Sequence, residues 1–154
     1  MERTFAMLKP DCVQRGLLGR VMAGFEEKGL KVVACKMIRM NEKMCREHYA
    51  HHADKPFFGR LVKFMTSAPV LCLALEGKEA VEVLRSACGA TNARAAAPGT
   101  IRGDFGLSVQ SNIIHASDSK ETAEREIARF FKKEEIFDYK RIDYETIYAE
   151  DERE

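Results

Sequence analysis

The sequence predicts an α/β or α+β fold in which one four-stranded sheet is covered by helices. Three observations support this. The chain has 154 residues, the length of one domain, and 45% of them are apolar, enough for a packed core. Short apolar runs typical of strands alternate with segments whose apolar residues recur at helical spacing. We see no internal repeat and no linker, so we expect a single domain over residues 1–154.

The first half of the chain contains two expected strands and three expected helices. The apolar run 3–8 predicts a strand that ends in a turn at Lys9–Pro10–Asp11. Residues 14–28 carry apolar side chains at helical spacing and precede Gly29, a residue typical of helix ends, so they predict a helix. Residues 30–40 predict a second strand, and residues 42–52 and 57–65 predict two further helices.

The second half adds two strands, two helices and one irregular segment. Residues 70–75 predict a strand that ends near Gly77, and residues 78–88 predict a helix. Residues 89–106 are rich in glycine and proline without periodicity, which favours a functional loop. A last strand centred on residues 112–115 precedes a helix over residues 119–131, with Ser119 as its N-cap. The aromatic tail is expected to dock as far as Tyr148, with residues 149–154 frayed. This order fits a βαββαβ, ferredoxin-like arrangement.

Charge and composition argue against several classes of protein. Lys and Arg exceed Asp and Glu by 25 − 24 = 1, which disfavours a general nucleic-acid binder and leaves room for a local basic pocket. No apolar run approaches the ~18 residues of a membrane span, and residues 1–4 carry no apolar export signal. The five cysteines form no Cys-x-x-Cys pair and are interpreted as free thiols, so we expect a reducing cytoplasm.

The segment 112–119 is the best candidate for chemistry. The sequence contains no P-loop, no GxGxxG after a strand, no GxSxG and no HExxH, so any phosphate chemistry needs another arrangement. His115 stands at a strand end, and a neutral imidazole is a nucleophile once a partner fixes its tautomer. The local candidates for that partner are Ser117, Asp118 and Glu126. The plainer interpretation, which composition alone favours, is a helix cap beside a packed histidine.

Scattered polar residues could form a phosphate pocket if the fold gathered them at one sheet edge. They stand near turns and are Lys9, Arg85, Thr91 and Arg102. Taken singly, each is more simply explained as solvated surface.

Two features near the middle of the chain have competing interpretations. Cys45, His48 and His52 fall on one face of the expected helix 42–52 and could hold a metal, although a partly exposed polar face is the simpler explanation. Phe57 and Phe58 could be core anchors or a stacking surface, and the core is the simpler expectation for at least one of them.

Several segments together resemble one known family over essentially the whole chain. The matching segments are Glu2–Phe5, Lys9–Asp11, Val13–Gly16, Glu47–Tyr49, Pro56–Phe58, Pro98–Phe105, Asn112–Ser119 and Glu124–Ile127. The pattern Asn-x-x-His-x-Ser-Asp is specific, and it stands in register with Lys-Pro-Asp and Pro-Gly-Thr-Ile-Arg-Gly. In these segments the chain closely resembles the nucleoside diphosphate kinases.

The resemblance implies an α+β, ferredoxin-like βαββαβ sandwich with a four-stranded antiparallel sheet covered by helices. It also implies transfer of the γ-phosphoryl group from a nucleoside triphosphate to a nucleoside diphosphate, by a ping-pong mechanism through a phosphohistidine at His115. The implied catalytic residues are His115, Lys9, Tyr49, Asn112, Ser117 and Glu126. The implied nucleotide contacts are Lys9, Phe57, Leu61, Arg85, Thr91, Arg102 and Asn112, with Phe57 stacking on the base. The implied cofactor is Mg²⁺, held mainly by nucleotide phosphates and water, with Asp118 as a candidate partner through water.

The resemblance further implies nucleoside di- and triphosphates as partners, no membrane, no specific nucleic acid and a homohexamer built from dimers. The chain departs from the family pattern at Cys12, at Ala116 and over residues 89–97, where Ala90 and Ala93 replace the usual glutamate and proline. That loop often forms a subunit contact, so the departures bear on its rigidity and on assembly. Two other function classes are a non-enzymatic relative, which the presence of His115 argues against, and a metal-binding protein built on Cys45, His48 and His52.

Overall fold

The four strands form one antiparallel sheet in the order β2-β3-β1-β4. The computed structural model describes residues 1–153 of the chain. The strands are β1 (Glu2–Leu8), β2 (Lys31–Ile38), β3 (Val70–Gly77) and β4 (Ile114–Ala116). Helical segments connect β1 to β2 and β3 to β4, which gives the βαββαβ order. The predicted α+β, ferredoxin-like sandwich is therefore confirmed.

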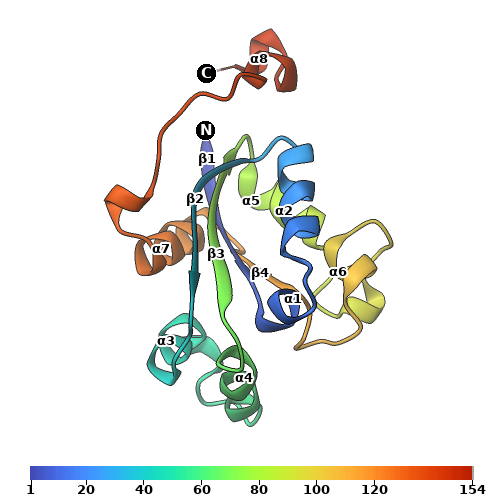
Figure 1. The fold of residues 1–154 in the computed structure, drawn as a ribbon, viewed down its shortest axis with the longest axis vertical. Coiled ribbons are helices and arrows are strands. Elements are labelled where there is room, and N and C mark those ends of the chain that lie inside the picture. The colour runs from blue at the N-terminus through green and yellow to red at the C-terminus, as the bar shows by residue number, and fades with distance from the viewer. Residues whose placement is uncertain (154) are drawn as a thin grey trace.

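Helices cover both faces of this sheet (Figure 1). The α-helices are α1 (Pro10–Gln14), α2 (Leu18–Glu27), α3 (Glu42–His48), α4 (Phe58–Met65), α5 (Ala80–Cys88), α6 (Ile101–Phe105), α7 (Lys120–Phe130) and α8 (Tyr144–Ile147). Short 3₁₀ helices lie at Ala50–His52, Ala93–Ala95, Lys133–Glu135 and Glu150–Glu152. In Figure 1, α2 and α5 lie on one side of the strands and α7 on the other, while α3 and α4 extend beyond one end.

Each face of the sheet has its own apolar core, because neighbouring side chains of a strand point to opposite faces. On β1, Phe5 and Met7 pack into the cluster that includes Phe130 of α7. Ala6 and Leu8 pack into the other cluster with Phe25 of α2. The central strands are buried on both sides, which explains why their sequences are continuous apolar runs rather than alternating patterns.

Three helix boundaries differ from the prediction. The expected turn at Lys9–Pro10–Asp11 opens the short helix α1, because proline is well suited to the first position of a helix. The expected helix 14–28 is interrupted at Gly16, whose φ is +67°, and α2 starts only at Leu18. The expected helix 42–52 ends at His48 and continues as a 3₁₀ turn.

Two differences concern the second half of the chain. The segment 89–106, expected to be irregular, contains α6, whose N-cap Thr100 accepts a hydrogen bond from the Gly103 amide. Strand β4 begins at Ile114 and not before Asn112, because Ile113 has a φ of +75°, outside the β region. The helix predicted over residues 119–131 is found as α7, with the predicted cap: the Ser119 hydroxyl accepts a bond from the Thr122 amide at 3.1 Å.

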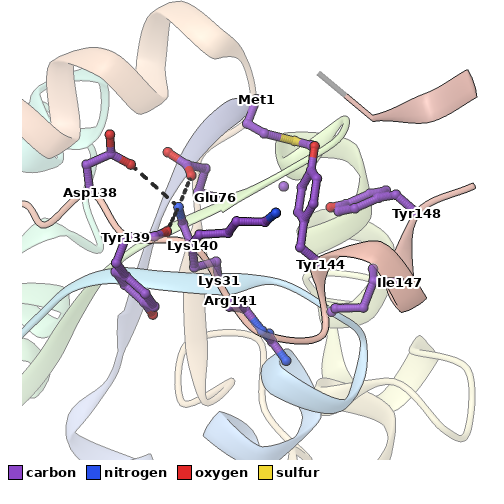
Figure 2. Close-up of a pocket in the computed structure, with 12 residues that line it drawn as sticks. Met1, Lys31, Glu76, Asp138, Tyr139, Lys140, Arg141, Tyr144, Ile147 and Tyr148 are labelled. Carbon is purple, nitrogen blue, oxygen red and sulfur yellow. Dashed lines mark hydrogen bonds and ion pairs between the residues drawn. The ribbon is translucent and has the colours of Figure 1, made fainter. Parts of the chain in front are cut away.

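The C-terminal tail returns along β2 toward the N-terminus (Figure 1). The Tyr139 hydroxyl donates to the Val32 carbonyl at 2.7 Å, and the Tyr148 hydroxyl accepts from the Lys78 amide at 3.2 Å. Figure 2 shows the pocket of about 460 Å³ that the tail encloses, in which Lys31 pairs with Glu76 at 2.6 Å. Within residues 149–154, expected to fray, the structure describes the 3₁₀ turn at 150–152, and Glu154 lies outside the described residues.

Among the helices of residues 1–153, none is both long enough and apolar enough to cross a membrane.

Candidate active site

Lys9 and Asn112 lie next to each other although 103 positions separate them in the sequence. Lys9 follows the central strand β1, and its amide donates to the Ile113 carbonyl at 2.8 Å. Its ammonium donates to the Asn112 side-chain oxygen at 2.7 Å. Burial, together with the positive charge of Arg102, lowers the pKa of Lys9 to about 8. The amide nitrogen of Asn112 donates to the Thr91 carbonyl at 2.8 Å, which ties the 89–91 loop to this cluster.

The backbone just before His115 is strained. Ile113 is β-branched and adopts a φ of +75°, a conformation that such residues rarely occupy. Two bonds hold it there: its carbonyl accepts from the Lys9 amide, and its amide donates to Asp11 Oδ2 at 3.0 Å. The strained residue therefore fixes where β4 begins and where the next side chains point.

His115 on β4 faces a carboxylate from α7. His115 Nε2 lies 2.8 Å from Glu126 Oε1, and Glu126 Oε2 accepts a 2.5 Å bond from the Ser117 hydroxyl. Glu126 and Ser117 are buried, whereas the side chain of His115 keeps 21% of its exposure. A carboxylate only accepts hydrogen bonds, so His115 Nε2 carries the proton and Nδ1 keeps its lone pair.

Two arginines and the 89–91 loop complete the cluster. Three carbonyls hold the Arg102 guanidinium: Gly89 at 2.8 Å, Ile114 at 2.7 Å and Asn112 at 3.3 Å. Burial lowers its pKa, although a guanidinium stays charged at any physiological pH. Arg85, near the end of α5, and Thr91 are exposed and line the same cavity.

The cavity in front of His115 has a volume of about 390 Å³, within the usual range of ligand pockets. Lys9, Arg85 and Arg102 supply positive charge at its wall. Of the described residues that line it, none carries a carboxylate. The cavity therefore favours an anionic ligand.

Aromatic side chains lie in and beside the cavity wall. Tyr49 is buried against His48, with ring centroids 4.6 Å apart, and burial raises the pKa of its phenol. Phe57 and Leu61 do not line the 390 Å³ cavity itself. Phe57 is half-buried beside α4 and contacts the ring of His52, which does line the cavity, at 5.2 Å. Leu61 lies one helical turn further along α4 and is buried in the core.

Cys45, His48 and His52 do not form a metal site in the described part of the chain. The metal-ligand types that do meet, within 4.8 Å, are His48, His115 and Glu126. Cys45 is buried in the core of the α7 face. Mg²⁺ prefers oxygen ligands and keeps several waters, and the acid-free wall of the cavity fits an ion that arrives with phosphates rather than an all-protein cage.

Comparison with known proteins places this arrangement in a family. The model of the family described as "Nucleoside diphosphate kinase" matches residues 2–136. A nucleoside diphosphate kinase of Archaeoglobus fulgidus is 55% identical over 150 residues, 97% of this chain and 99% of the relative. One of Pyrococcus horikoshii is 54% identical over 143 residues, 91% of each chain.

The chain belongs to the nucleoside diphosphate kinase family. Among solved structures, the fold is similar to that of a halophilic nucleoside diphosphate kinase from Halobacterium salinarum in complex with CDP. The TM-score is 0.93 at 49% identity, over 96% of this chain and 99% of the other. The protein is thus an enzyme, a kinase that binds nucleotides.

The structure of this nucleoside diphosphate kinase brings most of the predicted site residues together. His115, Ser117 and Glu126 form one hydrogen-bonded group. The predicted residues that line the cavity are Lys9, Tyr49, Arg85, Thr91, Arg102, Asn112 and His115. Phe57 and Leu61 lie off the cavity wall. Asp118 is exposed just before the cap of α7 and is likewise absent from the wall.

The departures from the family pattern have local explanations. Cys12 is fully buried in the α2–α5 core, where burial raises the pKa of its thiol to about 12. Ala93, at the position of the usual proline, is buried, and the Arg94 guanidinium donates to the Leu107 carbonyl at 3.2 Å. Ala90 and Ala116 line the cavity with small side chains. The loop is therefore held by packing and hydrogen bonds rather than by a proline.

Sequence reasoning missed three histidine placements. His51 and His52 line the mouth of the cavity, with ring centroids 3.9 Å apart, and His48 lies behind His115 at 4.5 Å. All three stand in the Cys45–His52 segment, for which the sequence suggests either a metal-binding helix face or a partly exposed polar face. The α-helix ends at His48, and His51 and His52 belong to the 3₁₀ turn that follows. No residue pattern in the sequence predicts this helix end.

Proposed function

We propose that this kinase transfers the γ-phosphoryl group from a nucleoside triphosphate to a nucleoside diphosphate through a phosphohistidine at His115. The observation that carries the proposal is the 2.8 Å contact between His115 Nε2 and Glu126 at the wall of a cation-lined cavity. This contact leaves the Nδ1 lone pair as the nucleophile. Ser117 supports the assignment, because it holds the other oxygen of the same carboxylate.

The reaction then consists of two half-reactions at one site. In the first, His115 Nδ1 forms a bond to the γ-phosphorus while the bond from that phosphorus to the β–γ bridging oxygen breaks, and the diphosphate leaves. In the second, a terminal oxygen of another diphosphate bonds to the phosphorus and the P–N bond breaks. Glu126 accepts the hydrogen bond from His115 Nε2 in both half-reactions, so no proton is consumed. Because donor and acceptor use the cavity in turn, the kinetics are ping-pong.

Three cations would stabilise the phosphoryl group during transfer. Lys9, Arg85 and Arg102 supply charge for the equatorial oxygens. Arg102 is held by three carbonyls before any ligand arrives, so little reorganisation is needed. Asn112 orients Lys9, while Tyr49 and Thr91 line the wall beside them.

Phe57 would contact the nucleotide base, and Leu61 lies one helical turn further along α4. A ring that is half-buried and partly free suits stacking, which accepts any base because every base has a π-face. The enzyme should therefore tolerate purines and pyrimidines.

Mg²⁺ is the cofactor in this proposal. The nucleotide phosphates and water would hold it, with Asp118 as a candidate partner through water. When bound, Mg²⁺ supplies charge neutralisation on the phosphate oxygens.

Compartment and assembly complete the proposal. All five cysteines are free thiols, four of them buried, which supports a reducing cytoplasm. The edge strand β2 exposes Met37 and Cys35, and edge strands of small sheets are usually paired or covered. This supports a closed homo-oligomer, for which we propose a homohexamer built from dimers.

The test is phosphoenzyme formation in matched histidine variants. His115→Ala should fold normally and take no label from γ-labelled ATP, whereas His51→Ala, at the mouth of the same cavity, should be labelled. Double-reciprocal plots of the unaltered enzyme should be parallel. Label retained in His115→Ala, or intersecting plots, would contradict the proposal.

A further inference from the structure

His48 is a buried histidine for which the proposed chemistry has no use. Its side chain is fully buried, and its ring edge meets the ring of His115 at 4.5 Å and 74°. Tyr49 and Phe130 enclose it with ring centroids at 4.6 Å and 5.2 Å. Burial, with help from the neighbouring His115 and Arg129, lowers the pKa of His48 to about 2, so the ring is neutral.

The neighbours of His48 Nδ1 decide which nitrogen carries its proton. Arg129 Nη1, from α7, lies 3.4 Å from Nδ1, and a guanidinium can only donate. Glu126 Oε1 lies 3.6 Å from the same nitrogen, beyond hydrogen-bond reach. Nδ1 must therefore keep its lone pair and accept from Arg129. The proton is then on Nε2, which has no hydrogen-bond partner among the described residues.

This tautomer has a consequence for Glu126. The oxygen that accepts from His115 at 2.8 Å is the same Oε1 that faces His48 Nδ1. A proton on His48 Nδ1 would make it a second donor to that oxygen. A second donor would draw charge from the carboxylate and weaken its bond to His115 Nε2. When His48 Nδ1 carries no proton, His48 does not compete with His115 for Glu126 Oε1.

We propose that Arg129 and His48 are positioning residues, which keep Glu126 reserved for His115 by fixing the His48 tautomer with its proton on Nε2. The inference rests on the proposed function, since it assigns these two residues to the support of His115 as carrier. Arg129 acts through His48, and His48 acts through Glu126 and through its ring contact with His115. Neither residue needs to touch the nucleotide.

Nitrogen NMR of the histidine rings tests the tautomer in the unaltered full-length protein, before any nucleotide is added. The expected spectrum shows His48 protonated at Nε2 and His115 protonated at Nε2. In Arg129→Met, the His48 proton should move to Nδ1, while Arg129→Lys, which keeps a donor-only cation, should retain the original tautomer. A His48 proton on Nδ1 in the unaltered protein would overturn the proposal.

The rate of phosphoenzyme formation tests the consequence. Arg129→Met should slow it on the order of 10-fold, a loss comparable to that of outer partners of metal-bound histidines, with little change in nucleotide KM. Arg125→Met is the matched control, because Arg125 lies on the same helix and donates to the Thr122 hydroxyl at 3.1 Å, and it should leave the rate unchanged. An unchanged rate in Arg129→Met would overturn the proposal.

A double-mutant cycle separates the positioning role from simple charge. In a His48→Phe background, which keeps the ring edge but removes both nitrogens, Arg129→Met should have no further effect on the rate. A persistent effect there would show that Arg129 acts by charge alone. If the unaltered protein forms no phosphoenzyme, the proposed function fails. If the unaltered protein forms a phosphoenzyme and Arg129→Met forms it at the same rate, only the positioning role fails.

Discussion

Lys9 sets the electrostatic state of the cavity at the scale of single residues. It is buried, and its ammonium donates to the side-chain oxygen of Asn112 and to the Gln110 carbonyl rather than to a carboxylate. A phosphate would supply the missing negative charge. The sequence indicated Lys9, Arg102 and His115 as candidates, because each residue type suits phosphate chemistry. It could not indicate the low pKa of Lys9, which follows from burial of the ammonium and from the nearby charge of Arg102 after folding.

The pKa of Lys9 predicts how nucleotide capture depends on pH. Because the value in the free enzyme is about 8, Lys9 is charged below pH 8 and becomes neutral above it. The value of kcat/KM should therefore be level on the acid side and fall as pH rises through about 8. Lys9→Arg should remove this fall, since a guanidinium stays charged. A profile of the unaltered enzyme that stays flat through this range would contradict the role.

Phe57 predicts the base tolerance. Phe57→Ala should weaken the binding of purine and pyrimidine nucleotides alike, by roughly 1–3 kcal/mol, because the lost interaction is stacking. Phe64→Ala, in the same helix but packed at the core, serves to separate loss of stability from loss of binding. Equilibrium binding of ADP and CDP checks this. Loss of affinity for adenine nucleotides alone would show hydrogen-bond recognition instead.

Helix α7 shows at the scale of elements what sequence patterns do and do not reveal. Its apolar spacing and its cap at Ser119 were predictable, because both are local. The short helix α6 and the late start of β4 were not. The helix α6 lies within a stretch of glycines that hides its periodicity, and the φ of Ile113 depends on bonds to Lys9 and Asp11, about 100 positions away.

The cap of α7 allows a test of this element. Ser119→Ala should lower the free energy of unfolding by about 1 kcal/mol, because the Thr122 amide loses its acceptor. Ser86→Ala, at an exposed position within α5, should change it little. Urea unfolding of both variants measures the difference. Equal stability of the two variants would show that the cap contributes nothing.

The arrangement of the whole molecule explains why the sheet edges matter. Strands β2 and β4 are the edges of the sheet, and the tail covers part of β2 through Phe137, whose amide donates to the Val33 carbonyl at 2.8 Å. Met37, further along β2, remains 52% exposed. Sequence patterns predicted the layers and the docked tail, but not which backbone groups of β2 the tail would cover.

The open part of this edge and the altered 89–97 loop predict the order of disassembly. The proposed oligomer should dissociate toward dimers in mild denaturant before its subunits unfold, because the loop lacks the proline expected to stiffen one type of subunit contact. Light scattering across a urea series, read beside circular dichroism, follows size and folding together. A monomer at low protein concentration without denaturant would contradict this expectation.

The central claim, that His115 carries the phosphoryl group between nucleotides, is tested most directly by a chase of isolated phosphoenzyme. The protein is mixed with γ-labelled ATP, freed of nucleotide and then given an unlabelled diphosphate such as CDP or GDP. The account predicts an acid-labile label on His115 that passes to either diphosphate at least as fast as steady-state turnover. A label that stays on the protein, or leaves more slowly than turnover, would contradict the account.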